Sequence, residues 1–217
     1  MNSIHKTIID GRRHAEPIQD SVTKRSIDCI TERGLRDAVA VGRGYIGFQG
    51  TVFGFHSGMN RTNQTLSGIN VGMERAFEKY QEMSNVLGQG FVQGANLPKG
   101  MPYNAEFISY LLEHNPGMAE RVGQEVGLFL SQAYQEGVKK GDTDTLIFGI
   151  SHAPKIEIAY GMLMGLPKKE IPELIANPLD GFKVEVDRHK KSGTIDRCLI
   201  SYKGQTFEQL NSGIFKL

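Results

Sequence analysis

Side chains that can carry out chemistry follow three apolar runs of the sequence, in each case where a predicted strand ends. They are Arg13-His14, His56-Ser57 and Ser151-His152. Arg61 comes shortly after the second pair, in the expected first turn of a helix. A neutral imidazole can attack a phosphoryl group, and a guanidinium group can hold phosphoryl oxygens through two parallel hydrogen bonds. These residue types together predict an anion-binding site with a histidine nucleophile.

Each pair alone also has a simpler interpretation. Arg13-His14 is typical of a solvated turn, His152 of a residue that caps the following helix, and His56 of a packing or supporting role. Helix stability does not explain the position of Arg61, because a cation near a helix start interacts unfavourably with the helix dipole. The coincidence favours a site, since strands that end at one edge of a parallel sheet bring the residues after them into a single crevice.

The elements that would position these residues alternate between strands and helices, which indicates an α/β sandwich. The nearly continuous apolar run of residues 145–150 suits the centre of a parallel sheet, and Thr31 is the expected N-cap of the first helix. Residues 16–30 are polar enough to predict a loop, and residues 87–104, rich in Gly and Pro, predict a functional loop. The expected strands cover residues 7–12, 51–55 and 145–150, with an antiparallel edge pair at 182–186 and 195–202. The expected helices cover residues 31 to 44 or 47, 60 onward, 71–84, 105–113, 117–140 and 154–164. The last of these helices is expected to begin at Pro154.

The composition narrows the partners and the compartment. The formal net charge of +1 gives no overall field that would attract nucleic acid or an anionic membrane, so neither is an expected partner. Two cysteines, Cys29 and Cys198, without a Cys-x-x-Cys pattern argue against a structural zinc site and a disulfide scaffold. The N-terminus lacks an apolar signal segment and the chain lacks a membrane-length apolar run, which predicts a cytoplasmic protein.

Taken in order along the chain, the chemical pieces resemble the histidine phosphatase superfamily, which includes phosphoglycerate mutases, sugar bisphosphatases and phosphohistidine phosphatases. The resemblance implies one domain over residues 1–217. Its expected fold is a three-layer α/β sandwich with a mostly parallel central sheet, an antiparallel edge strand and a helical lid insertion at residues 87–140. The matching segments are Arg13-His14-Ala15-Glu16, Ile30-Thr31-Glu32-Arg33-Gly34, the stretch from Ser57 to Thr65, and Ser151-His152-Ala153.

The resemblance also implies roles for individual residues. His14 would be the nucleophile and would form a phosphohistidine, while Arg13, Arg61 and a protonated His152 would bind the phosphoryl oxygens, with Ser57 beside them. Arginine suits this role because its planar fork stays charged. Phosphoryl transfer needs mainly positioning and electrostatic stabilisation, so this pocket is expected to work without a metal or cofactor.

The sequence departs from the family pattern after both histidines and at the general acid. Ala15 and Ala153 stand where the family has glycine, which would reshape the site slightly. Residues 85–94, where many members carry a proton-donating carboxylate, contain none. Glu82 and Glu106 flank this segment, and either could supply the acid; alternatively there is none.

We therefore expect a phosphatase that hydrolyses a phosphomonoester or a phosphoramidate on a phosphorylated small molecule or phosphoprotein. A phosphoramidate would need less help from an acid, because its leaving nitrogen is easily protonated. The alternatives are a degenerate member that binds a phosphorylated ligand or protein without turnover, and a phosphoglycerate mutase-type phosphotransferase. A homo-oligomer is compatible with the sequence. An apolar ceiling over the site is expected from four lid residues, Phe91, Leu97, Met101 and Tyr103.

Overall fold

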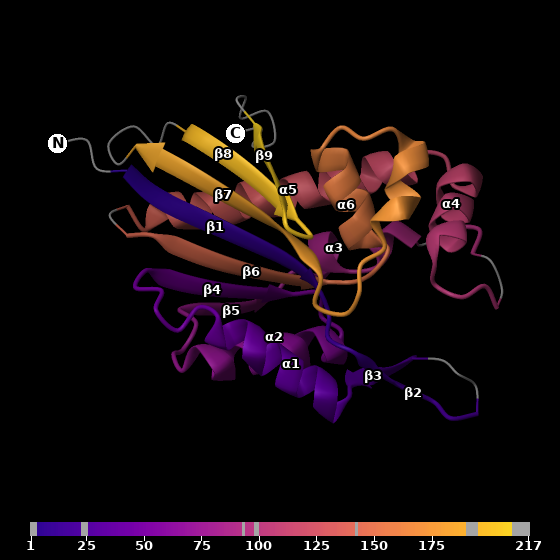
Figure 1. Ribbon diagram of the computed structural model, residues 1–217, viewed down its shortest axis with the longest axis horizontal. Coiled ribbons are helices and arrows are strands. Elements are labelled where there is room, and N and C mark those ends of the chain that lie inside the picture. Colours follow the sequence, from indigo (N-terminus) through magenta and orange to yellow (C-terminus); the bar gives the residue numbers. More distant parts are fainter. Residues whose placement is uncertain are drawn as a thin grey trace.

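The computed structural model describes residues 4–22, 26–92, 94–97, 100–141, 143–189 and 195–209. A seven-stranded sheet forms its centre (Figure 1). The first four strands in spatial order run parallel to one another, and the last three are antiparallel to their neighbours. The spatial order is β5 (Lys79–Glu82), β4 (Thr51–His56), β6 (Thr145–Ser151), β1 (Ile4–Arg13), β7 (Gly181–His189), β8 (Ile195–Tyr202) and β9 (Gln205–Gln209).

Register explains why the three chemical pairs come together. Strand β6 lies between β1 and β4, and all seven of its residues are buried, as its apolar sequence predicts. Arg13, the last residue of β1, is opposite Ser151, the last residue of β6, and His56 at the end of β4 is opposite Ile150. Three parallel strands therefore stop at the same level, and the residues that follow them share one edge of the sheet.

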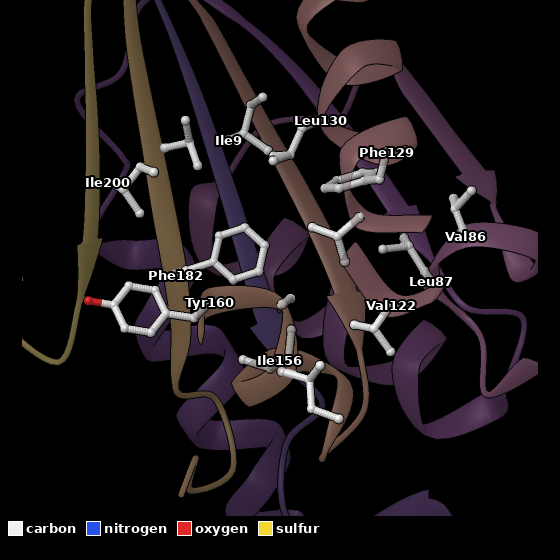
Figure 2. Close-up of a cluster of buried hydrophobic side chains, with 14 of the residues drawn as sticks. Ile9, Val86, Leu87, Val122, Phe129, Leu130, Ile156, Tyr160, Phe182 and Ile200 are labelled. Atoms are coloured by element: carbon white, nitrogen blue, oxygen red, sulfur yellow. The ribbon is translucent and has the colours of Figure 1, made fainter. Parts of the chain in front are cut away.

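Helices cover both faces of this sheet, which confirms the predicted sandwich. Helices α1 (Glu32–Arg43) and α2 (Asn60–Met73) pack on one face, where Leu146 and Phe148 of β6 join their apolar side chains. Helices α5 (Met118–Lys139) and α6 (Lys155–Leu163) pack on the other, against Ile147 and Ile9. Figure 2 shows Ile9 of the sheet beside Leu130, with Phe129 near them in the same cluster. Alternate residues of β6 thus serve opposite cores, as the two-residue period of a strand requires.

The smaller elements gather beyond the carboxyl ends of β1 and β6 (Figure 1). They are the short helix α3 (Ser84–Leu87), helix α4 (Ala105–His114), and two turns of 3-10 helix, η1 (Gly90–Val92) and η2 (Lys168–Leu174). Of the segment predicted as a lid, residues 87–140, helix α5 packs directly on the sheet through Val122, Phe129 and Leu130. Within the described ranges, no helix combines the length and apolar character needed to cross a membrane.

Helix α2, which carries Arg61, is held close to α1 by two glycines. A Cβ atom added to Gly42 would lie 2.0 Å from the carbonyl oxygen of Ile69, and one added to Gly72 would lie 2.0 Å from that of Val39. Only glycine permits so close an approach of two backbones. The C-terminal half of α2 is therefore held against α1 by close backbone contacts.

The predicted helix over residues 71–84 is wrong. Helix α2 continues to Met73 and ends at Glu74, whose left-handed φ of 56° stops it, and residues 79–82 form the parallel edge strand β5. Phe77 and Tyr80 have the sequence spacing of one helix face, but here their rings stack beside β4 with their centroids 6.1 Å apart. Tertiary contacts with the sheet edge here override the local pattern.

Three further expectations are corrected. Residues 16–30 are not an open loop but contain a two-stranded hairpin, β2 (Pro17–Gln19) and β3 (Ser26–Ile30), which projects from the body of the molecule (Figure 1). The antiparallel pair β7 and β8 is present but does not form the sheet edge, because β9 pairs outside β8. Pro154 is the N-cap of α6, whose first helical residue is Lys155. Thr31, by contrast, caps α1 as predicted, accepting from the Gly34 N–H.

Candidate functional site

His14 directly follows β1 and is fixed by its backbone and by its ring. Its N–H donates to the carbonyl of Ser151 at 3.0 Å, and Nδ1 lies 2.7 Å from the carbonyl oxygen of Ala15. Because a carbonyl only accepts, Nδ1 must carry the proton, and Nε2 of the neutral ring keeps its lone pair. Burial, reinforced by the charges of Arg61 and Arg13, lowers the pKa of His14 from 6.5 to about 4. Near neutral pH, His14 is therefore a neutral imidazole with its proton on Nδ1 and a lone pair on Nε2.

His152 follows β6, and its ring lies 5.3 Å from that of His14 at an interplanar angle of 62°. Its Nδ1 is 3.4 Å from Nη2 of Arg61, which can only donate, so Nδ1 accepts and Nε2–H donates to Ser57 Oγ at 2.7 Å. Burial, followed by the nearby His14 and Arg61, lowers the pKa of His152 to about 2. Burial beside cations therefore favours the neutral ring here, and the protonated His152 expected during phosphoryl transfer stays a prediction.

A directed chain of hydroxyl groups holds this His152 tautomer. Ser57 Oγ accepts from His152 and donates to Thr62 Oγ1 at 3.0 Å, and Thr62 in turn donates to the carbonyl of Met59 at 2.6 Å. Each member has one donor and one acceptor role, so the order of donation is fixed. The Ser57 hydroxyl, expected to contact the substrate, is engaged here with His152 and Thr62.

Arg61 lies in the first turn of α2 and is only 8% exposed. Its Nε is buried without a hydrogen-bond partner among the described residues, which leaves a donor available to an anion. Burial lowers its pKa, and the carboxylate of Asp28 acts in the opposite direction, with Asp28 Oδ1 at 3.8 Å from Nη1. Asp28 also caps α2 from hairpin strand β3, because it accepts from the backbone N–H groups of Asn60 at 2.9 Å and Arg61 at 3.1 Å.

Asp28 is a site residue that the sequence argument missed. The N-cap position of α2 is Met59, which makes no side-chain capping bond, so the cap comes from another part of the chain. A capping residue distant in sequence leaves no local signal. Asp28 also lies within residues 16–30, where the sequence predicts a loop and not the strand that positions it. The only available hint was an acid three residues before Thr31.

Arg13 ends β1 and points to the side of the site formed by α6 and the 174–176 segment. Its N–H donates to the carbonyl of Asp180 at 2.9 Å, Nη1 donates to the carbonyl of Ala176, and its guanidinium carbon is 4.8 Å from the ring centre of Tyr103. Burial lowers its pKa, and Glu157 and Asp180 act against that shift. Its Nε, like that of Arg61, is buried and has no partner in the described part of the chain.

The four predicted ceiling residues have different positions. Tyr103 reaches the site through its contact with Arg13, whereas Leu97 is 48% exposed and Met101 is partly buried. The side chain of Phe91 lies outside the described residues. Tyr103 is therefore the ceiling residue that the structure places against a predicted site residue.

The two alanines that replace family glycines fit without backbone strain. Ala15 is fully buried, and its N–H donates to Thr65 Oγ1 at 2.9 Å. Neither Ala15 nor Ala153 is among the residues with positive φ. Their backbones therefore need no left-handed conformation, the property for which glycine would be required.

Glu82 is the carboxylate that the structure brings to the site edge. It is the last residue of β5, opposite His56 in the parallel register, and a Cβ added to Gly58 would lie 2.5 Å from Glu82 Oε1. The carboxylate thus rests against the residue after Ser57. Glu106, the other candidate, lies in the first turn of α4, and both carboxylates are exposed. His56 has the supporting position, because its Nδ1 accepts from the Gly58 N–H at 3.2 Å.

A buried lysine fixes the segment that follows Glu82. Lys155, at the start of α6, donates through Nζ to the carbonyls of Val86 and Gly88, the latter at 3.0 Å, and forms an ion pair with Glu125 of α5. Ser151 Oγ donates to the carbonyl of Leu87 at 2.6 Å. The turn after β5 is therefore held against the two elements that carry His152. A single lysine gave no sequence signal for this role.

No protein-family model and no curated protein matches this sequence, but solved structures match its fold. A phosphoglycerate mutase from Bacillus anthracis str. Sterne superposes with a TM-score of 0.57 at 14% identity, over 87% of this chain and 93% of the other. The chain has the phosphoglycerate mutase-like fold. "Mycobacterial hydrolase 2" gives a TM-score of 0.57 at 14% identity over 100% and 96% of the two chains. A phosphoserine phosphatase from Entamoeba histolytica, in complex with 3-phosphoglyceric acid, gives 0.50 at 12% identity over 83% and 90%.

These neighbours confirm the fold that the resemblance implied. Phosphoglycerate mutase-like folds carry both mutases and phosphatases among the matched structures, so the fold is compatible with more than one phosphoryl-transfer reaction. At identities of 12–14% the activity has to be argued from the site itself.

Proposed function

We propose that this protein is a phosphatase that hydrolyses a phosphomonoester or phosphoramidate through a phosphohistidine on His14. The observation that carries the proposal is the hydrogen bond from His14 Nδ1 to the Ala15 carbonyl, which leaves Nε2 as the nucleophilic atom. Arg13 and Arg61, each with a buried, unpartnered Nε among the described residues, supply the charge that binds a phosphoryl group. The substrate is a phosphorylated small molecule or a phosphoprotein.

In the first step, the Nε2 lone pair attacks phosphorus, and the bond from phosphorus to the leaving oxygen or nitrogen breaks. The imidazole becomes cationic and keeps its Nδ1–H on the Ala15 carbonyl, which stabilises that charge. In the second step, water attacks the phosphoryl group, the N–P bond breaks, and Nε2 regains its lone pair. The two arginines stay charged throughout and offset the charge of the transferring group.

Glu82 is the general acid in this proposal. When protonated it delivers its proton to the leaving group, and the resulting carboxylate takes a proton from the attacking water in the second step. Its place at the end of β5, against Gly58 and beside His56, supports this role over Glu106. The acid missing from residues 85–94 would then be supplied by the strand just before them.

His152 would change its protonation on binding. An incoming dianion next to both imidazoles favours their charged forms and raises their pKa values. His152, neutral in this structure, would thereby become a charged donor to the phosphoryl oxygens, with Ser57 holding its orientation through Nε2. Thus the charge expected of His152 belongs to the bound state.

Hydrolysis of a generic aryl phosphate tests the function. We expect His14→Ala to abolish phosphate release, and Glu106→Gln, which changes an exposed carboxylate, to leave it unchanged. Wild-type activity in His14→Ala would contradict the proposal. Phosphate-ligand binding without any release by the wild type would favour the degenerate binding protein instead. Transfer that needs a bisphosphate primer would favour the mutase.

A further inference from the structure

The buried carboxylate of Glu157 takes no part in the proposed steps of phosphoryl transfer. Glu157 lies in α6 and is 0% exposed. Its Oε1 accepts from the backbone N–H of Ala176 at 2.9 Å and from the hydroxyl of Tyr103. Its Oε2 is buried and has no hydrogen-bond partner in the part of the chain that the structure describes. Burying a carboxylate with an unpartnered oxygen costs free energy, which favours its neutral form.

The two groups that bind Glu157 also hold Arg13. Ala176 gives its N–H to Glu157 and its carbonyl to Arg13 Nη1. Tyr103 gives its hydroxyl to Glu157 and the face of its ring to the Arg13 guanidinium, 4.8 Å away. The carboxylate and the guanidinium are therefore joined by two separate bridges, one through the backbone of Ala176 and one through the side chain of Tyr103. The charge of Glu157 also acts on Arg13 directly.

Among the described residues, few other charges act on Glu157. Arg13 and, more weakly, Lys203 favour its ionised form, and Lys203 is itself paired with Asp180 at 3.7 Å. Tyr202 is also close enough to interact electrostatically with Glu157, and its hydroxyl donates to the carbonyl of Leu174. Burial is the dominant influence and raises the pKa of Glu157 from 4.5 to about 7. Both protonation states are consequently accessible near neutral pH.

We propose that Glu157 is a positioning residue for Arg13 that takes up a proton when the phosphoryl anion binds. This inference rests on the proposed phosphoryl site. While ionised, Glu157 balances the charge of Arg13 and holds it through Tyr103 and Ala176. A dianion at Arg13 repels that carboxylate and favours its protonated form. The protonated form leaves the full charge of Arg13 to the anion, and the proton comes from solvent.

The sign of the resulting pH dependence follows from linkage. Binding raises the pKa of Glu157, so affinity is highest below about pH 7, where Glu157 already carries its proton. Above that pH, binding of the anion is accompanied by uptake of one proton from solvent, and affinity falls by up to about tenfold per pH unit. The same effect on KM is expected for a substrate, with kcat changed much less, because Glu157 does not touch the reacting atoms.

Sulfate is the probe for this test, since it remains a dianion across the relevant range whereas phosphate itself titrates. Its affinity is measured by calorimetry between about pH 6 and about pH 8.5 in the wild type, Glu157→Gln and Glu185→Gln. Glutamine keeps an oxygen for Tyr103 and Ala176 and imitates the neutral acid. Glu185 of β7 pairs with Lys6 and provides the matched loss of one negative charge.

The expected result is a pH slope about one proton smaller in Glu157→Gln than in the wild type, so that near pH 8 the variant binds sulfate roughly tenfold more tightly. Proton uptake by His14 or His152 contributes to all three proteins and cancels in the difference. Glu185→Gln should keep the wild-type slope. Equal slopes in the wild type and Glu157→Gln, or no sulfate binding at any pH, would overturn the inference.

A second variant, Tyr103→Phe, tests the inference if Glu157→Gln does not fold. Tyr103→Phe keeps the ring over Arg13 and removes the hydroxyl that donates to Glu157. The ionised carboxylate loses a donor, its pKa rises, and the fall in sulfate affinity should begin at a higher pH than in the wild type. An unchanged onset contradicts the inference. Because sulfate binding needs no turnover, these results are separate from the loss of hydrolysis expected for His14→Ala.

Discussion

The rings of His14 and His152 lie 5.3 Å apart, and both are neutral although two arginines flank them. Burial and the guanidinium charges act in the same direction on both rings, against protonation. Their outward bonds then fix the tautomers: Nδ1 of His14 donates to Ala15, and Nε2 of His152 donates to Ser57. The pair presents one nucleophilic nitrogen within a buried cluster that also holds the guanidinium groups of Arg13 and Arg61.

Acid sensitivity of the fold follows from these neutral rings. The folded pKa values of His14, about 4, and His152, about 2, lie below the 6.5 of an exposed histidine. The unfolded chain therefore binds protons that the folded chain excludes, so stability is full above pH 6.5 and declines as the pH falls toward 4. We expect the wild-type Tm to fall more steeply over this window than that of His14→Gln, measured by thermal melts. Parallel curves would contradict the buried neutral state of His14.

Asp28 should control the orientation of Arg61. Asp28→Ala removes the cap of α2 and the charge beside Arg61, and should cost about 1 kcal/mol of stability and roughly tenfold in kcat/KM. Asp28→Asn keeps a capping oxygen and should retain most of the stability while losing part of the activity. Asp37→Ala, which removes an exposed pairing with Arg33 on α1, is the control and should have neither effect. Denaturant unfolding and steady-state kinetics measure the two quantities; an Asp28→Ala variant as active as the control would refute this role.

The loss of kcat on removing the Glu82 carboxylate should depend on how strongly the leaving group needs a proton. Glu82→Gln is expected to lower kcat for an alkyl phosphate by about 10²–10⁴, because such a leaving group needs a proton. For a good aryl leaving group or a phosphoramidate the loss should be small. Parallel kinetics on the two substrate classes give the comparison, with Glu106→Gln as the matched exposed acid. An equal loss on both classes would mean that Glu82 acts through structure, and no loss would exclude it as the acid.

Much of the sheet and of the phosphoryl-binding residues could be predicted from sequence, because both depend on local patterns. The apolar run of β6 and the strand ends before His14, His56 and His152 indicated one crevice, and the register of β1, β4 and β6 shows why. The secondary-structure prediction failed where residues outside a helix have the spacing of a helix face. Phe77 and Tyr80 have the spacing of a helix, and that assignment concealed Glu82 at the end of a strand.

The remaining site residues act through contacts that sequence spacing does not record. Asp28 caps a helix that begins 32 residues after it, and Glu157 is joined to Arg13 through Tyr103 and Ala176. The neutral state of His152 is likewise a consequence of its complete burial among cations. Each of these properties depends on the packed structure, so residue type and order alone could not supply it.

The atom on His14 that receives the phosphoryl group tests the central claim most directly. The protein is incubated with a labelled phosphoryl donor, quenched in alkali and digested, and the His14 peptide is examined by mass spectrometry and phosphorus NMR. The bond from Nδ1 to the Ala15 carbonyl predicts acid-labile phosphate on Nε2. Phosphate on Nδ1, on another residue, or on no residue during active turnover would contradict the account.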